Sequence, residues 1–372
     1  MKITKAETWF CRRDRNYFDN ARTGSSPLPW DVVVLRLSTE EGFSSVVSFL
    51  GARSGLVTET YLHENILPVV LGRDAHEREA IWHEFWNLDR HLAFFPVYLP
   101  GPIDVALWEL AALQAGLPLY RYIGACRTSL PVYASGLFHE TAEEYVAEAK
   151  KYAAAGINAY KAHPCGPWRT DMDIASALRE GLGKDAVLLL DPVGEYTLEE
   201  AIRVGRHLET LNFLWLEEPF RDFELTKYHK LCETLDLPIA ATETTRGAHW
   251  GVAQAIVHGG VDIVRADVSW KNGVTGTLKI AHLAEAFGLN CEIHTTTMGL
   301  MDLANVHVSC AIRNCEYFEY FVPEENFRFP LKNPLNITPD GRIHVPETPG
   351  IGGDIDWECV DRMCVSHRIS SL

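Results

Sequence analysis

The chain has 372 residues, and its 34 Lys and Arg against 50 Asp and Glu give a formal net charge of −16 at pH 7. This length is more than twice the roughly 150 residues typical of one domain, so it allows a large barrel together with a second unit. A surface this acidic repels nucleic acids and anionic membranes, which excludes both as general partners. An anionic substrate would therefore have to meet a local positive feature.

The cysteine content and the first residues indicate the compartment. The nine cysteines include no CxxC pair, which predicts free thiols in a reducing compartment, with no structural disulfide and no zinc site. Residues 1–7 are polar and lack the apolar stretch of a signal peptide. The uncharged run at residues 93–103 contains three prolines and is too short to span a bilayer. We therefore expect a cytoplasmic protein.

The first third of the chain has the pattern of strands followed by helices. After a strand-like start, apolar runs at residues 32–37 and 45–50 predict two further strands, with a polar loop at residues 19–27 before them. Between residues 58 and 124 the apolar residues recur at helical spacing. We therefore expect an N-terminal α+β domain.

A repeating unit begins after Pro131 and consists of a short apolar run, a polar residue at its end and a helical stretch. The spacings between the successive polar residues are 30, 26, 26, 24 and 27 residues, and these residues are Lys161, Asp191, Glu217, Glu243, Asp267 and His294. The helical stretches lie at residues 143–155, 173–181, 198–211, 226–234, 251–258 and 276–287. A strand, a helix and two loops take about 25 to 30 residues, so this period predicts a parallel (β/α) barrel. The carboxyl ends of barrel strands meet at one mouth, where these side chains should gather.

Three of these polar residues are carboxylates on successive strands, namely Asp191, Glu217 and Glu243. Carboxylates this close repel one another unless a cation lies between them. An all-oxygen set suits Mg²⁺, which keeps positions open for substrate or water. Glu218 is an alternative to Glu217, because a strand alternates its faces and only one of the two can point into the barrel.

Two other pairs suit acid–base chemistry. Asp267 and His294 end neighbouring strands, so the carboxylate can hold one ring nitrogen and equip the imidazole as an acid or base. Lys161 and His163 are two residues apart and share a strand face, which should be the barrel interior. A metal ion near Lys161 would lower its pKa, so this lysine could act as a base or neutralise a substrate carboxylate.

Taken together, these residues and their order resemble the enolase superfamily, and within it the mandelate racemase-like subgroup of acid-sugar dehydratases and racemases. The resemblance covers nearly the whole chain and is carried by residues 103–109 and 116–120, Lys161-Ala162-His163, Asp191, residues 215–219, Thr242-Glu243, residues 261–267 and 292–294, Glu319 and residues 349–352. It implies a (β/α)7β barrel, a modified TIM barrel, at residues 128–324, and an α+β capping domain from residues 1–127 completed by residues 325–372. It also implies Mg²⁺ held by the three carboxylates, and a base that removes the proton α to a substrate carboxylate to give an enediolate.

The resemblance also assigns a role to Glu319, which would be protonated and would hydrogen-bond the substrate carboxylate. Glu316 is the competing candidate for this role. Two departures from the family pattern stand out. The usual Lys-x-Lys is Lys161-Ala162-His163, so an imidazole takes the place of one base. Pro192-Val193-Gly194 follows Asp191 where an Asn is commonly found two residues after the ligand. Both departures indicate a divergent subgroup.

Specificity in such a fold comes from loops over the barrel mouth, here residues 17–30 and 51–58. The candidate substrate-binding residues are Asn20, Arg22, Ser25, Trp168, Arg169, Thr170, Arg246 and His249. The loop residues among them could equally be solvated, and Arg246 and His249 could equally cap the next helix.

The leading hypothesis is a Mg²⁺-dependent dehydratase of a hydroxylated carboxylate such as a sugar acid, giving a 2-keto-3-deoxy acid. A racemase, epimerase or cycloisomerase would use the same enediolate, although a muconate-type cycloisomerase would need a strand-six lysine and Lys271 lies four residues past Asp267. Outside enzymes, the alternative is a non-catalytic acid-sugar-binding homologue. An amidohydrolase barrel is disfavoured, because residues 133–136 lack the HxH of such sites. We expect a small anionic hydroxy acid as partner, and a homo-oligomer.

Overall fold

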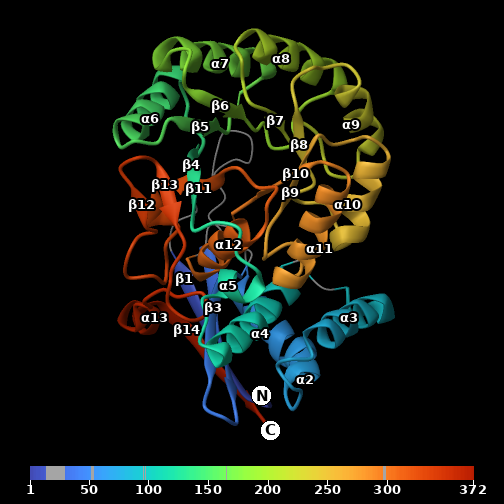
Figure 1. Ribbon diagram of the computed structural model, residues 1–372, viewed down its shortest axis with the longest axis vertical. Coiled ribbons are helices and arrows are strands. Elements are labelled where there is room, and N and C mark those ends of the chain that lie inside the picture. The colour runs from blue at the N-terminus through green and yellow to red at the C-terminus, as the bar shows by residue number, and fades with distance from the viewer. Residues whose placement is uncertain (14–29, 52–53, 95, 97, 165, 296–298) are drawn as a thin grey trace.

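The computed structural model describes residues 1–13, 30–51, 54–94, 96, 98–164, 166–295 and 299–372. It has two parts, a four-stranded antiparallel sheet with its helices at one end and a parallel sheet ringed by helices at the other (Figure 1). We call the first part the cap and the second the barrel. Both chain termini lie at the end of the cap away from the ring of helices (Figure 1).

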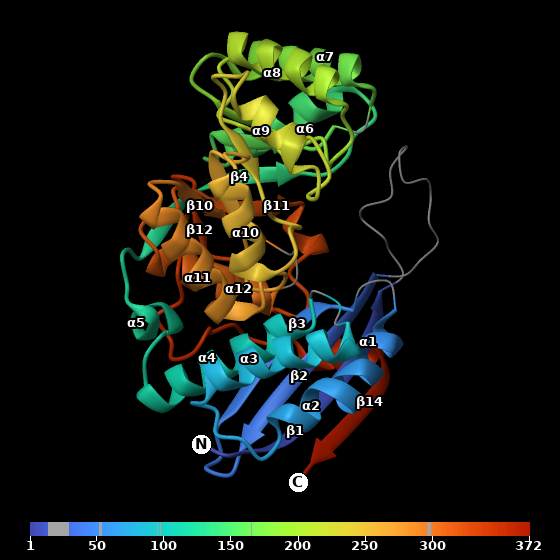
Figure 2. The same ribbon diagram turned by 90° about the vertical axis from the view of Figure 1, so that its right-hand side faces the viewer.

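The cap is built from both ends of the chain. Its sheet has the order β14-β1-β2-β3, with antiparallel neighbours throughout (Figure 2). Because successive strand side chains point to opposite faces, Val33 and Leu35 of β2 join the main core, whereas Val32 and Val34 join a second cluster with Val360. The cap elements are β1 (Ile3–Arg13), β2 (Trp30–Thr39), β3 (Ser44–Leu50), α1 (Gly55–Tyr61), a π-helix (Leu62–Ile66), α2 (Leu67–Val70), α3 (Arg78–Leu88), a second π-helix (Asp89–Ala93), α4 (Pro100–Ala115), α5 (Leu119–Ile123), α13 (Trp357–Met363) and β14 (Cys364–Ser371).

The barrel strands alternate with helices along the chain, and its parallel ladders run in the order β11-β4-β5-β6-β7-β8-β9-β10. The barrel elements are β4 (Ser129–Gly136), α6 (Ala142–Ala154), β5 (Ala159–Ala162), α7 (Trp168–Leu182), β6 (Val187–Leu190), α8 (Leu198–Thr210), β7 (Leu216–Glu217), α9 (Leu225–Cys232), β8 (Ile239–Ala241), α10 (Ala248–Val257), β9 (Ile263–Ala266), α11 (Gly273–Ala286), β10 (Asn290–Ile293), α12 (Leu300–Ala311) and β11 (Phe318–Val322). This order confirms the expected (β/α)7β fold class. A 3-10 turn (Glu324–Asn326) follows, and the hairpin of β12 (Ile337–Thr338) and β13 (Arg342–His344) pairs with the start of β4.

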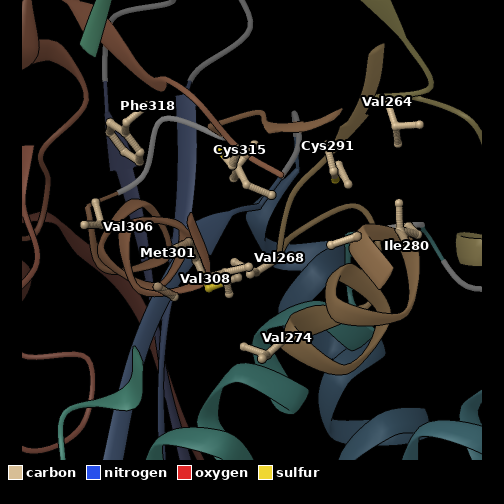
Figure 3. Close-up of a cluster of buried hydrophobic side chains, with 14 of the residues drawn as sticks. Val264, Val268, Val274, Ile280, Cys291, Met301, Val306, Val308, Cys315 and Phe318 are labelled. Atoms are coloured by element: carbon tan, nitrogen blue, oxygen red, sulfur yellow. The ribbon is translucent and has the colours of Figure 1, made fainter. Parts of the chain in front are cut away.

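Apolar side chains fill the space between the strands and the helices that cover them. Figure 3 shows Ile280 of α11 beside Val264 of β9, and Val306 of α12 beside Phe318 of β11. All four side chains are fully buried. Burying a side chain of this size stabilises a fold by about 1.5 to 3 kcal/mol relative to leaving it exposed. This packing holds the strand ends in fixed positions around the barrel mouth.

One buried carboxylate joins the cap to the barrel. Asp104 of α4 accepts hydrogen bonds from the backbone N–H and the hydroxyl of Thr275, at 2.8 and 2.6 Å, in the first turn of α11. It therefore caps a barrel helix from the cap. Gly273 has φ of +86°, and a Cβ there would lie 2.2 Å from an Asp104 oxygen, so glycine alone fits this approach.

The predicted helices and strands of the barrel agree with the observed ones to within a few residues, with one omission, and no element was predicted in the C-terminal part that contains β12, β13, α13 and β14. Sequence reasoning named no helix between His294 and the last barrel strand, where the structure has α12, whose twelve residues are all buried. A helix that is buried all round shows no polar face, so the amphipathic signal is weak. In the part of the chain that is described, no helix is long and apolar enough to cross a membrane.

Candidate active site and metal centre

The three predicted metal ligands come together at the carboxyl ends of neighbouring strands. Asp191 directly follows β6, Glu217 ends β7, and Glu243 lies two residues beyond β8. Each offers one oxygen, and the three oxygens lie within 4.8 Å of one another. The structure thus gathers the carboxylates that the spacing of the repeat predicts.

The donor set fits Mg²⁺. All three donors are carboxylate oxygens, the kind of ligand that this hard cation prefers. Glu243 Oε2 is buried and has no hydrogen-bond partner among the described residues, so it is available to a cation. Burial, together with the neighbouring carboxylates, raises the pKa of Glu243 well above its ordinary value despite the nearby imidazole of His294. A divalent cation would remove this repulsion and let all three groups ionise.

A layer of buried charges lies beside the three carboxylates. Lys161 Nζ is 2.6 Å from Glu319 Oε1 and 3.0 Å from Glu217 Oε1. Arg265 places Nε 2.8 Å from Glu217 Oε1 and Nη2 2.6 Å from Glu319 Oε2. None of these four side chains is more than 1% exposed. Two cations and two anions therefore compensate one another inside the barrel.

The charges in this layer set the direction of two pKa shifts. Burial by itself lowers the pKa of Lys161, but the charges of Glu217 and Glu319 outweigh it and hold that pKa well above its ordinary value. Burial raises the pKa of Glu319, but Lys161 and Arg265 outweigh it and hold that pKa well below the ordinary value. The charges of this layer thus favour a protonated Lys161 and an ionised Glu319. The expected lowering of the Lys161 pKa by a metal ion, and the protonation of Glu319 beside a substrate carboxylate, stay predictions. Glu316, the competing candidate for the role of Glu319, is exposed.

His163 lies next to Asp191, on the strand side expected from its spacing to Lys161. Its Nδ1 is 2.6 Å from the carbonyl oxygen of Gly136, and because a carbonyl only accepts, Nδ1 carries a hydrogen. Its Nε2 lies 3.2 Å from Asp191 Oδ2. Burial opposes ionisation of Asp191, but the charges of Lys161 and His163 outweigh it and lower its pKa to about 2. In the neutral imidazole, Nε2 is the nitrogen that can accept a proton.

The predicted acid–base pair is formed. His294 Nδ1 lies 3.0 Å from Asp267 Oδ2, and Nε2 lies 3.7 Å from Glu243 Oε2, so the ring spans from its carboxylate partner to the metal ligands. Burial lowers the pKa of His294, but Glu243 and Asp267 outweigh it and raise the pKa to about 9. The half-buried ring of Trp270 stacks on the imidazole with centroids 4.8 Å apart. His294 is thus held as an imidazolium whose Nε2 faces the carboxylates.

Of the two adjacent glutamates, Glu217 joins the metal cluster and Glu218 turns to the next loop. Glu218 Oε1 accepts a hydrogen bond from the backbone N–H of Glu243 at 2.8 Å, and Oε2 accepts one from the hydroxyl of Thr244 at 3.3 Å. The geometry therefore favours Glu217 over Glu218 as the metal ligand, which stays a prediction.

Known proteins match this chain over both of its parts. Residues 144–359 match the family described as enolase C-terminal domain-like, and residues 25–124 match the mandelate racemase/muconate lactonizing enzyme N-terminal domain. The chain belongs to the enolase superfamily.

Three relatives illustrate the similarity. An arabinonate dehydratase of Saccharolobus solfataricus is 26% identical over 336 residues, covering 88% of this chain and 89% of that protein. A D-mannonate dehydratase of Caulobacter vibrioides is 30% identical over 367 residues, covering 87% of this chain and 89% of that protein. The crystal structure of a D-glucarate dehydratase from Agrobacterium tumefaciens complexed with magnesium superposes with a TM-score of 0.88 at 29% identity, covering 98% of this chain and 100% of that one.

Two of the predicted substrate-binding residues, Trp168 and Arg246, lie in the part of the chain that the structure describes. Asn20 and Arg22 lie outside the described residues. The ring of Trp168 lies under the guanidinium groups of Arg169, at 4.1 Å, and Arg203 of α8, at 5.9 Å, and so packs among the outer helices. Arg246 is exposed and lines a cavity of about 80 Å³ between α3 of the cap and the loops after β8 and β9. Neither side chain contacts the metal cluster among the described contacts.

Arg265 is the residue of the site that sequence reasoning passed over. A signal was present, because Arg265 interrupts an apolar strand and stands two residues before Asp267, on the same face. A lone arginine in a buried strand must be paired with a carboxylate. Ser135 of β4, whose hydroxyl donates to Glu319 Oε1 at 2.9 Å, had no such signal.

Proposed function

We propose that this protein is a Mg²⁺-dependent dehydratase of a hydroxylated carboxylate, a sugar acid, and that it gives a 2-keto-3-deoxy acid. The reaction removes the proton α to the carboxylate and then expels the 3-hydroxyl as water. It requires a base at the α carbon, positive charge at the carboxylate and an acid at the leaving hydroxyl.

Asp191, Glu217 and Glu243 would hold Mg²⁺, which when bound supplies positive charge that stabilises the enediolate formed from the substrate carboxylate. Once Asp191 holds Mg²⁺, that carboxylate would no longer favour a second hydrogen on His163, and the neutral ring, whose hydrogen Gly136 O fixes on Nδ1, would accept the α proton on Nε2. Lys161, which keeps its proton, would add a second positive charge at the substrate carboxylate.

The observation that carries the dehydratase proposal is the pairing of His294 with Asp267 beside the metal ligands, with Nδ1 3.0 Å from Asp267 Oδ2 and Nε2 3.7 Å from Glu243 Oε2. An imidazole whose pKa is raised to about 9 carries a proton at neutral pH and can deliver it from Nε2 to a leaving hydroxyl. Asp267 holds Nδ1 and thereby fixes the ring orientation. The dehydratases among its relatives, at 26% and 30% identity, support the same reaction class.

The test is to incubate the Mg²⁺-loaded protein with a panel of aldonic and aldaric acids and to measure 2-keto acids. We expect His294→Asn to lower turnover by about 10² or more, because general acid–base catalysis typically contributes 10²- to 10⁴-fold. The matched control is His229→Asn, at a side chain that is 50% exposed on α9, and it should leave turnover unchanged.

The outcomes separate the alternatives. Absence of 2-keto acid across a broad panel would refute dehydration. Solvent deuterium that enters the α position without loss of water would indicate a racemase, epimerase or cycloisomerase. Binding of an acid sugar without turnover, with affinity unaffected by His294→Asn, would indicate a non-catalytic binder.

A further inference from the structure

The third metal ligand is carried by a turn, whereas the other two are fixed by the barrel strands. Glu217 lies within β7, and the backbone N–H of Asp191 donates to Ala162 O of the neighbouring strand at 3.0 Å. Glu243 instead follows Thr242, which has φ of +88°, and so stands on a turn that has left the β8 ladder. The position of its carboxylate therefore depends on what holds residues 242–247.

The first residue of the turn is tied to β9, because the hydroxyl of Thr242 donates to Arg265 O at 2.9 Å and accepts from Arg265 N–H at 3.2 Å. Two buried groups of opposite charge hold the residues that follow. Glu218, 7% exposed, accepts the backbone N–H of Glu243 and the hydroxyl of Thr244. Lys271, fully buried in the loop between β9 and α11, donates from Nζ to the backbone carbonyl of Thr245 at 2.5 Å. The carboxylate of Glu218 thus binds a backbone N–H of the turn, and the ammonium group of Lys271 binds a backbone carbonyl of the turn.

Lys271 is a buried cation that the proposed reaction does not use. Burying an ammonium group is costly unless it is paired and hydrogen-bonded, so its place needs a compensating contact. The contact that the structure gives it is the carbonyl two residues beyond the third metal ligand. Hydrogen bonds from charged donors are about twice as strong as neutral ones, and they suit the fixing of a backbone segment.

We propose that Lys271 is a positioning residue of the metal centre, which anchors the 242–247 turn through Thr245 O and so holds Glu243 in place for Mg²⁺. The inference rests on the proposed function only in taking Glu243 as a Mg²⁺ ligand. The proposal predicts that removing Lys271 weakens Mg²⁺ binding, which is opposite to what the loss of a positive charge alone would do. Removing a positive charge near the carboxylates would by itself tighten Mg²⁺ binding, whereas releasing the turn weakens it.

The experiment measures the Mg²⁺ dissociation constant by isothermal titration calorimetry, without substrate, for the wild-type protein and for Lys271→Met. Loss of a group that orients a ligand typically weakens metal binding 10- to 100-fold, and we expect at least about tenfold for Lys271→Met. Lys271→Arg keeps the charge and the donors and should recover part of the affinity. The matched control is Lys230→Met, which removes an exposed lysine on α9 and should leave the constant unchanged.

Thermal melts in EDTA establish that each variant is folded. If Lys271→Met does not fold, Lys271→Gln, which retains a neutral donor on a shorter side chain, should show weakened binding in its place. Unchanged or tighter Mg²⁺ binding by the folded variant overturns the role of Lys271. A wild-type protein that binds no Mg²⁺ overturns the metal-dependent function itself, and with it this inference.

Discussion

Replacing Arg265 by Met tests whether the buried charge layer holds the barrel interior together. The guanidinium group is fully buried and contacts Glu217 at 2.8 Å and Glu319 at 2.6 Å. Methionine has a similar length and no charge, so the substitution removes the cation and leaves little empty space. Both carboxylates keep one cation, since Lys161 lies 2.6 Å from Glu319 and 3.0 Å from Glu217.

Breaking a buried ion pair by removing one partner costs about 3 to 5 kcal/mol, because the remaining charge stays buried. Since Lys161 still compensates both carboxylates, we expect the lower end, a loss of about 3 kcal/mol in the free energy of unfolding at pH 7.5. Without Arg265 the pKa of Glu319 rises from its lowered value, so the folded variant takes up a proton at a higher pH than the wild-type protein. The difference in stability between the two should therefore shrink as the pH falls through the pKa of Glu319 in the variant.

The assay is urea unfolding in EDTA, so that metal binding at Glu217 does not contribute. The control is Arg206→Met, at a side chain that is 50% exposed and pairs with Glu209, where surface ion pairs are worth about 0 to 1 kcal/mol. A loss for Arg265→Met no larger than that of the control would refute the buried-layer reasoning.

Three further outcomes are expected. Mg²⁺ at 100 times its dissociation constant should raise the free energy of unfolding by about 2.7 kcal/mol in thermal or urea melts, and no stabilisation at any Mg²⁺ concentration would contradict the metal site. Burial lowers the pKa of His307 to about 4 from its ordinary 6.5, so the unfolded state takes up the proton first and stability is lost as the pH falls through this window. The loss is about 3 kcal/mol, and His307→Gln should flatten the pH dependence of urea unfolding between pH 7 and pH 4; an unchanged slope would be the contrary result. Asp267→Asn removes an anion and a hydrogen-bond acceptor from the His294 ring, so the pKa of His294 should fall by about 1 to 3 units from its raised value. An NMR titration of labelled histidines measures this pKa. An unchanged pKa would show that Asp267 does not raise it.

The repeat and its strand-end residues could be predicted because they depend on local patterns. The spacing from Lys161 to His294 reflects the length of one strand, one helix and two loops, which chain geometry fixes. The closeness of Asp191, Glu217 and Glu243 then follows from the convergence of strand ends in a barrel. The pairing of Asp267 with His294 follows from the adjacency of β9 and β10 in the same way.

The sequence gives little guidance for residues whose role depends on side-chain direction across elements. Trp168 begins α7, and its ring lies 5.9 Å from the guanidinium group of Arg203 on α8. Local patterns place a residue at a helix start but do not give its rotamer, which packing against the neighbouring helix decides. For the same reason, the contact between Lys271 and the carbonyl of Thr245 could not be read from their separation of 26 residues.

The sequence by itself determined the barrel, its order of elements and the identity of the groups at its mouth, because periodicity and strand alternation are properties of short segments. The tertiary structure decided the ionisation of those groups. The charges favour a protonated Lys161 and an ionised Glu319 because Arg265, more than fifty residues before Glu319 in the chain, completes a buried set of two cations and two anions. A pKa depends on burial and on every charge within a few ångströms, and only the folded chain brings those charges together.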